Sequence, residues 1–431
     1  MSRDFGESLY DVLTGDEEGR ACRDIPESAC REQPRNFLLQ ASSLAATKTG
    51  DGLADTKLVL PWLLTAVGAP AAAIGMLVPI REALALLPQL VISAGIRALP
   101  VRKWAWVAGS AVQGLAVLLM ALAVSNLEGA AAGWTVVGLV ALFAAARSVA
   151  SISHKDVLGK TVDKQRRGTV SGVAGTLAAG FVLAFGAGLA MGWIPLTVSA
   201  LAVALMVAGA CWLLAALLFA GLVEEPGATD GGANGIADVI GQFRLLRDDP
   251  QLARFIVVRG LLVGTALAPP YLLALAGAGG GAQLGELGLF VLASGIATLT
   301  SSYVWGRFAD RSSRRALIVA GLVGAAATGS AALLGPWTQA PWVLPALLFV
   351  LLTAHQGVRL GRKTHLVDMA GKDHRAAYTA LSNTAIGLLL LLGGGFGLVA
   401  EAFGVATVLA LFALMALAAS GLARGLEEVQ A

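Results

Sequence analysis

The chain has 431 residues, of which 56% are hydrophobic and only 14% are charged, and its formal net charge is +3. Soluble domains carry about 25% charged residues, which is well above the charged fraction of this chain. Together with a mean hydropathy of +0.74, this difference excludes a soluble globular protein. The deficit of charge extends over most of the chain and predicts many membrane spans. The small net charge argues against a nucleic-acid partner.

The first 35 residues are polar and rich in Asp and Glu. They lack the apolar core and the small-residue cleavage site of a signal peptide, so we expect a cytoplasmic tail. Cys22 and Cys30 lie in this segment with neither a nearby histidine nor the spacing of a zinc site. We therefore expect Cys22 and Cys30 to be free thiols. The third cysteine, Cys211, lies in an apolar run.

Apolar runs long enough to cross a membrane recur along the rest of the chain. A membrane helix needs about 20 mostly apolar residues. The runs predict an all-α protein with twelve spans: 37–64, 71–96, 104–125, 133–155, 169–192, 197–222, 253–276, 286–306, 316–334, 342–362, 377–400 and 404–423.

Basic residues are confined to alternate joints between these spans. The joints after the odd-numbered spans contain no Lys or Arg. Cytoplasmic loops collect basic residues, so the pattern predicts a multi-pass protein of the cell (inner) membrane with both termini in the cytoplasm. The basic residues of the other joints are Arg97, Arg102, Lys103, Lys160, Lys164, Arg166, Arg167, Arg244, Arg247, Arg311, Arg314, Arg315, Lys372 and Arg375.

The longest polar joint, residues 223–252, follows the sixth span. Within it five apolar residues fall at helical spacing, which predicts an amphipathic helix at the cytoplasmic surface. These residues are Ile236, Val239, Ile240, Phe243 and Leu246.

An internal repeat relates the two halves of the chain. LPWLLTAVGA at 60–69 aligns with PPYLLALAGA at 269–278, and residues 154–176 align with residues 362–384, at offsets of 209 and 208. The common offset predicts two six-helix bundles that are parallel copies of one plan. It also predicts that the charged stretch 46–61 lies inside the first membrane helix. The predicted organisation is a tail at 1–35, a bundle at 36–222, a linker at 223–252, a second bundle at 253–424 and a tail at 425–431.

This layout resembles the major facilitator superfamily of secondary transporters. The stretch GRFADRSSRR resembles the family's G-x-x-x-D-R-x-G-R-R loop, with Ser313 at the last glycine. Arg147 resembles the arginine of the family's fourth-helix R-x-x-x-G motif, with Ser151 at the glycine. The fifth span lacks the proline of the family's antiporter signature, which argues against drug–proton antiport. The resemblance implies a cytoplasmic gate formed by Gly306, Asp310, Arg311, Arg314 and Arg315.

Several ionisable residues are predicted near the middle of the spans. Each costs about 2.5–3.5 kcal/mol at the bilayer centre, so these side chains must face one another or a wet cavity. Asp51 and Arg147 are the strongest candidates for substrate or ion handling, and a structural ion pair is the alternative. Lys57 lies on the opposite face of the first helix and is expected to snorkel. The candidate residues are Lys48, Asp51, Asp55, Arg81, Glu82, Arg147, Arg259 and His355.

The resemblance implies secondary active transport by alternating access, with the substrate site between the halves. Mid-depth charges of both signs favour a small charged or zwitterionic solute, and proton coupling is a further hypothesis. A transporter-like sensor or scaffold without transport is the alternative function. The sequence has no H-E-x-x-H or G-x-S-x-G motif, so neither an enzyme nor a bound cofactor or metal is expected. The expected partners are the solute and lipid, and a monomer is expected.

Overall fold

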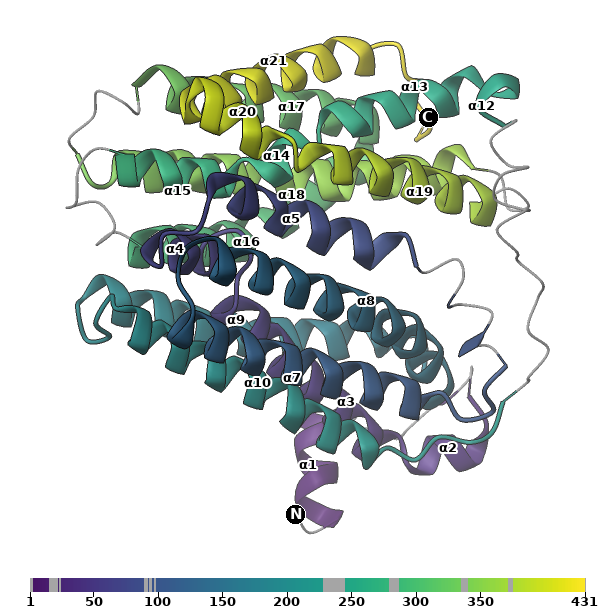
Figure 1. The fold of residues 1–431 in the computed structure, drawn as a ribbon. Helices are drawn as coiled ribbons and strands as arrows, with labels where there is room; N and C mark the ends of the chain where they lie inside the picture. Colours follow the sequence, from purple (N-terminus) through teal and green to yellow (C-terminus); the bar gives the residue numbers. More distant parts are fainter. Residues whose placement is uncertain are drawn as a thin grey trace.

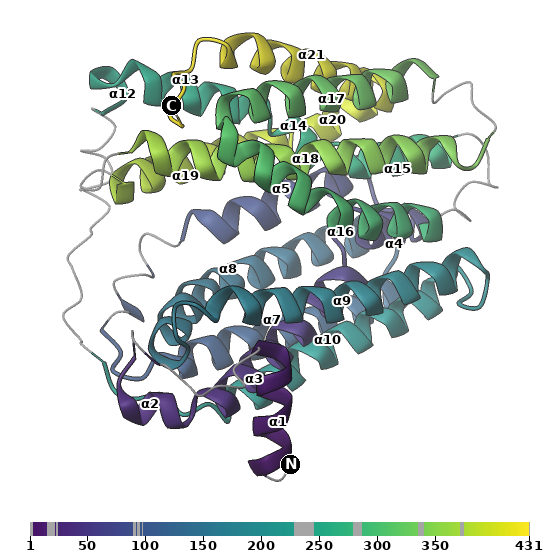
Figure 2. The ribbon, with the colours of Figure 1, turned by 180° about the vertical axis from the view of Figure 1, so that it is seen from behind.

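A computed structural model shows a helical chain, drawn in Figure 1 and from behind in Figure 2. It describes residues 3–14, 22, 25–88, 92, 95–96, 98–227, 245–278, 287–334, 340–370 and 375–430. Within these ranges there is no strand, as expected for an all-α protein. The predicted amphipathic helix of the linker falls mostly outside them, and only the short helix α12 (Leu245–Asp248) is described there.

Each of the twelve predicted spans coincides with a helix or a broken helix. The first six are α3 (Gln33–Leu53) with α4 (Val59–Ala66), α5 (Ala71–Leu86), α7 (Lys103–Asn126), α8 (Gly129–Thr161), α9 (Arg167–Ala190) and α10 (Val198–Ala220). The last six are α13 (Pro250–Leu261) with α14 (Gly264–Leu267) and α15 (Pro269–Ala278), α16 (Leu287–Arg311), α17 (Ser313–Leu334), α18 (Val343–Met369), α19 (Arg375–Gly393) with α20 (Phe396–Phe403), and α21 (Val405–Ala423).

Nine helices in the described ranges are long and apolar enough to cross a membrane, and the bent helix α16 makes ten. The remaining two spans carry charges of both signs. Helix α3 contains Lys48 and Asp51, and α5 has 16 residues, with Arg81 and Glu82 among them. Asp51, Arg81 and Glu82 belong to the candidate site described below.

The first helix of each half is broken at the same place. Helix α3 ends at Leu53 and α4 begins at Val59, while α13 ends at Leu261 and α15 begins at Pro269. At the offset of 209, Pro61 aligns with Pro270, and a proline removes one helical hydrogen bond and clashes with the preceding turn. The prediction of one continuous helix through 37–64 is therefore wrong, because this turn interrupts it.

The helices form two packed groups (Figures 1 and 2). Helix α3 packs on α9 and α10, and α7 packs on α8 and α10; in the other group α17 packs on α18 and α21, and α13 packs on α19 and α21. The most extensive connections between the groups come from α5, which contacts α8, α19 and α20, and from α16, which contacts α18 and α9; α4 also contacts α15.

Glycines bring the two groups into backbone contact at one end. A Cβ atom on Gly75 of α5 would lie 2.7 Å from the Cα atom of Gly397 in α20. A Cβ atom on Gly288 of α16 would overlap the backbone of Ala190 at the end of α9. All four positions lie beside the predicted external joints. We call these two contacts the glycine seams; they close that end of the interface.

An acidic residue after the last helix of each half holds the start of that half's third helix. The buried Glu224 carboxylate accepts the N–H groups of Arg102 (3.1 Å) and Lys103 (2.6 Å) and pairs with Lys160 Nζ at 2.9 Å. After α21, Glu428 accepts the Ser312 hydroxyl at 2.7 Å and pairs with Arg314 at 3.4 Å. These pairings join helices within a half.

Glu224→Gln is expected to lower the melting temperature in detergent. The amide keeps an acceptor for the backbone but leaves Lys160 without its carboxylate, which removes about 1–3 kcal/mol from the free energy of unfolding. Glu225→Gln is the matched control, because Glu225 is exposed. Equal melting temperatures for the two variants would show that the buried carboxylate does not stabilise the fold.

The N-terminal segment corrects one prediction. Helix α1 (Arg3–Thr14) and helix α2 (Glu27–Arg31) precede α3, and Cys22 and Cys30 form a disulfide with Cα atoms 6.0 Å apart. The expectation of free thiols is therefore wrong for this pair, because the two residues lie close enough to bond. The buried Tyr10 hydroxyl accepts from Gln33 Nε2 at 2.6 Å, which holds α1 against α3. Cys211 is a free thiol.

Candidate functional site

Asp51 brings three predicted residues together. Its Oδ1 atom accepts hydrogen bonds from Arg81 Nη2 at 2.8 Å and from Arg147 Nη1 at 2.7 Å. The three residues lie on α3, α5 and α8, and α5 also contacts the other helix group. The geometry therefore joins the first, second and fourth spans through one carboxylate.

These three side chains are partly exposed although they lie among packed helices. The exposed fraction is 21% for the Asp51 side chain, 18% for Arg81 and 36% for Arg147. The Arg81 guanidinium also lies 6.0 Å from the centroid of the Phe143 ring. This partial exposure distinguishes the cluster from a fully buried ion pair.

Glu82 connects this cluster to the second helix group. Its side chain is 36% exposed and lies 3.5 Å from Arg81 Nη1. It also interacts electrostatically with Lys57 and with Arg362 of α18. Glu82 therefore interacts with charged groups of both halves. The sequence predicted only that Glu82 lies near the middle of a span.

Lys57 does not snorkel away from the site. It interacts electrostatically with Glu82, Asp55 and Arg359. The expectation assumed a continuous helix, with each residue turned by about 100° from the last. Because the chain leaves the helical path between α3 and α4, Lys57 is directed instead toward the charged cluster.

Asp55 holds the turn between the two segments of the broken helix. Its Oδ1 atom accepts the backbone N–H groups of Lys57 at 2.5 Å and Leu58 at 3.1 Å. Aspartate side chains stabilise turns by accepting from the backbone two residues further along the chain. The structure thus places Asp55 beside the site and gives its carboxylate a local contact with the backbone.

Asp55→Ala is expected to remove about 1 kcal/mol from the free energy of unfolding, and Asp55→Asn much less, because asparagine accepts the same backbone hydrogen bonds in a turn. Thermal unfolding of both variants in detergent measures this difference. A larger loss of stability for Asp55→Asn than for Asp55→Ala would contradict this role in the turn.

The hydrogen bonds of Lys48 and His355 lie outside the Asp51 cluster. Lys48 Nζ donates to the carbonyl of Ser171 on α9 at 3.1 Å. His355 Nδ1 lies 3.0 Å from Thr265 Oγ1. Lys48 also interacts electrostatically with Asp51.

Arg259 is buried with neutral hydrogen-bond partners. It is 6% exposed and donates to Ser382 Oγ at 2.6 Å and to Asn383 Oδ1 at 3.0 Å. Arg362 is its electrostatic neighbour. These contacts lie within the second half, and none of them involves Asp51.

Two charged residues of α18 were not predicted from the sequence. Arg359 interacts electrostatically with Lys57, and Arg362 with Glu82. They follow His355 by four and seven residues, which places all three on one helix face. Extending that face from His355 is the signal that could have identified them.

The observed contacts of the predicted gate loop lie within the second half. Asp310, Arg311 and Arg315 are exposed, and Gly306 is half-buried. Arg314 pairs with Glu428, which belongs to the same half. The observed contacts of the loop therefore connect it with the C-terminal segment.

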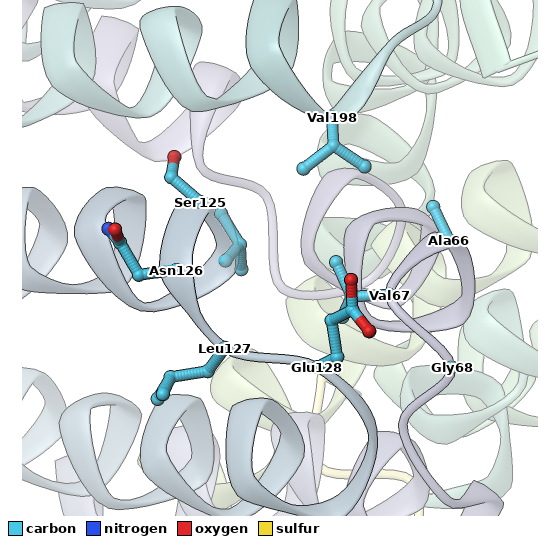
Figure 3. A pocket seen from close by; sticks show the side chains of 9 residues that line it. Ala66, Val67, Gly68, Ser125, Asn126, Leu127, Glu128 and Val198 are labelled. Carbon is cyan, nitrogen blue, oxygen red and sulfur yellow. The ribbon is translucent and has the colours of Figure 1, made fainter.

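A separate hollow lies at the predicted external end (Figure 3). It is lined by the joint after α4, the joint between α7 and α8, and Val198 of α10, and Glu128 is its charged residue. The lining residues are Ala66, Val67, Gly68, Val124, Ser125, Asn126, Leu127, Glu128 and Val198. It is open and contains none of the predicted site residues.

No protein-family model matches the sequence, and no curated protein matches it. Solved transporter structures are similar in fold. A point mutant of the nucleoside transporter NupG has a TM-score of 0.70 at 15% identity, covering 91% of this chain and 100% of that one. A D-xylose-proton symporter has a TM-score of 0.67 at 14% identity, covering 91% and 98%. The inward-open xylose transporter XylE from E. coli has 0.62 at 13%, covering 90% and 95%.

These structures cover nearly the whole chain, so the fold is that of major facilitator superfamily transporters, as the resemblance implied. The chain is an all-α, multi-pass membrane protein. At 13–15% identity the likeness concerns the fold, and the chemistry of the site depends on this chain's own residues.

Proposed function

We propose that the protein is a secondary transporter that carries a small charged solute by alternating access. The observation that carries the proposal is the Asp51 carboxylate between Arg81 and Arg147, partly exposed. Buried ion pairs seldom stabilise better than apolar packing does, so their retention in an otherwise apolar chain favours a functional role. The similar folds of a nucleoside transporter and a xylose–proton symporter support this reading.

The transport path would run between two bundles, residues 36–222 and 253–424, joined by the linker 223–252, with tails at 1–35 and 425–431. In this proposal both termini are cytoplasmic and the protein lies in the cell inner membrane as a monomer. The glycine seams, which close the predicted external end, would then belong to a state that opens toward the cytoplasm. Proton coupling would use Asp51 or Glu82, the carboxylates at the partly exposed cluster.

The Asp310 and Arg311 side chains would act as a cytoplasmic gate only in another state of the cycle. In the present state both are exposed. The Glu224 and Glu428 contacts would keep each half rigid while the halves move, since they join helices of the same half.

A metabolite screen tests the proposal. Purified protein is heated with single metabolites, since a ligand that binds only the folded state raises the melting temperature. Each stabilising compound is then offered to proteoliposomes. Uptake that saturates, and that empty liposomes lack, would support transport. Binding without uptake would identify a sensor instead.

A further inference from the structure

An aromatic ring supports one of the two arginines that bind Asp51. The Arg81 guanidinium lies over the Phe143 ring, 6.0 Å from its centroid, while Arg81 Nη2 donates to Asp51 Oδ1 at 2.8 Å. A cation at this distance is attracted by the negative face of an aromatic ring. Arg81 therefore has two kinds of support, a hydrogen bond through an N–H group and the ring of Phe143.

A second aromatic residue holds the Phe143 ring in place. The Trp212 ring of α10 meets it edge to face, with the two centroids 5.0 Å apart and an interplanar angle of 86°. This is a favourable geometry for an aromatic pair. Both residues are buried, so close packing limits the movement of the Phe143 ring.

These contacts form a closed circuit around Asp51. Trp212 lies against Gly50, the residue before Asp51, where a Cβ atom would lie 2.7 Å from Trp212 Cζ3. Any side chain at position 50 would displace the indole ring, so the glycine allows the ring to reach α3. The circuit runs from Asp51 through Arg81, Phe143 and Trp212 back to α3.

Helix α8 contributes to the contacts of both arginines. Arg147 follows Phe143 by four residues, so the two side chains lie on one face of α8. Arg147 Nη1 donates to the same Asp51 oxygen at 2.7 Å. Arg81 instead comes from α5, which also contacts α19 and α20 of the other helix group. A movement of α5 against α8 would therefore act on the contacts of Arg81.

The two kinds of support tolerate different amounts of movement. A hydrogen bond weakens steeply when its angle or its length leaves a narrow range. The attraction between a cation and a ring depends on their separation and leaves the N–H donors of the guanidinium free. Arg81 can thus turn its N–H groups away from Asp51 while its guanidinium stays on the Phe143 ring.

We propose that Phe143 is a positioning residue of the transport site, which holds the Arg81 guanidinium while its N–H groups exchange Asp51 for an acceptor on the solute. This inference rests on the proposed transport function. Phe143 acts through Arg81 and does not need to contact the solute. Trp212 acts one step further away, by fixing the orientation of the Phe143 ring.

Uptake kinetics test this role. Proteoliposomes are supplied singly with succinate, alanine, adenosine or D-xylose, and wild type is compared with Phe143→Met, which is similar in size but has no ring. For each compound that the wild type accumulates, the half-saturating concentration should rise about threefold or more in Phe143→Met, the effect of losing a cation–ring contact. The maximal rate should stay nearly unchanged, whereas a purely structural loss would lower it by reducing the number of active molecules.

Phe143→Tyr and Phe219→Met are the matched variants. Phe143→Tyr keeps the ring and should retain the half-saturating concentration of the wild type. Phe219 is a buried aromatic residue of the same half whose ring stacks on Trp106 with centroids 3.9 Å apart. Phe219→Met should therefore leave the half-saturating concentration unchanged. Size-exclusion chromatography verifies that each variant is folded.

Melting temperatures in detergent test the contact without any solute. Residues in contact give non-additive effects when both are replaced. Phe143→Met should therefore lower the melting temperature less in an Arg81→Gln background than in the wild type. Phe219→Met should lower it equally in the two backgrounds.

The outcomes separate this inference from the proposed function. An unchanged half-saturating concentration in Phe143→Met, or an equal increase in Phe143→Tyr or Phe219→Met, would overturn the positioning role while leaving transport intact. Additive melting temperatures for Phe143→Met and Arg81→Gln would overturn the contact itself. If the wild type accumulates none of the compounds, the transport of these solute classes is contradicted and the positioning role falls with it, whereas the melting temperatures still decide whether the ring holds Arg81.

Discussion

Asp51→Asn is expected to reduce solute counterflow about a hundredfold or more while the protein still inserts and folds. Asparagine has nearly the same shape, but it cannot balance the charges of Arg81 and Arg147, whose nitrogens lie 2.8 Å and 2.7 Å from Asp51 Oδ1. Removing one partner of such a pair costs about 3 kcal/mol or more, equivalent to about two powers of ten. Counterflow in proteoliposomes measures the loss, and size-exclusion chromatography verifies folding.

A second substitution separates solute handling from a structural ion pair. Arg147→Gln added to Asp51→Asn restores the charge balance of the cluster. If the pair only supports the fold, the double variant should regain counterflow. We expect it to stay inactive, because both side chains would be needed during transport. Wild-type counterflow in Asp51→Asn alone would reject the assigned role.

Gly75→Leu is expected to open the predicted external end and to stop transport. A Cβ atom at this position would lie 2.7 Å from the Cα atom of Gly397, and a backbone atom cannot move aside as a flexible side chain can. Helices α5 and α20 must therefore separate. Spin labels at Asn126→Cys and Glu401→Cys, both exposed, should report a longer distance across that end.

Gly180→Leu is the matched control for this substitution. Nothing lies within 4 Å of a Cβ atom on Gly180, so the same side chain should change neither the label distance nor the uptake rate. An unchanged distance in Gly75→Leu, or an equal change in both variants, would show that the glycine seams do not hold the two groups together.

Hydropathy and charge predicted the parts of the fold that depend on average composition. All twelve spans have helical counterparts, because burial in lipid demands long apolar runs whatever their neighbours are. The cost of isolated charge correctly indicated that Asp51 needs partners, and Arg81 and Arg147 were among the candidates. The free-energy cost of burying a charge applies to every ionisable residue alike, so it does not specify which charges pair.

What the sequence did not reveal depends on local departures from regular structure. The break after Leu53 redirects Lys57, and helical periodicity assumes that no such break occurs. Pro61 is a sequence feature that could have indicated the break, since prolines disfavour a continuous helix. Likewise the pairing of Cys22 with Cys30 depends on local backbone geometry that brings their Cα atoms within 6.0 Å, which apolar patterning does not encode.

Contacts between distant segments were equally hidden. Glu224 lies in a polar joint with nothing to mark it, yet its carboxylate is buried against Lys103 and Lys160. Arg362 ends a predicted span and was not among the predicted site residues. Its proximity to Glu82 depends on how the two halves are placed together, which a single sequence does not specify.

The most direct measurement concerns water at the charged cluster, because hydrated access from alternate sides distinguishes a transport path from a dry ion pair. A chain with its native cysteines replaced and Glu82→Cys introduced is exposed to a membrane-impermeant thiol reagent from each side of a vesicle. We expect reaction from the predicted cytoplasmic side, and a shift of reactivity to the external side when Gly75→Leu is added. Failure to react from either side would contradict a hydrated path through the cluster.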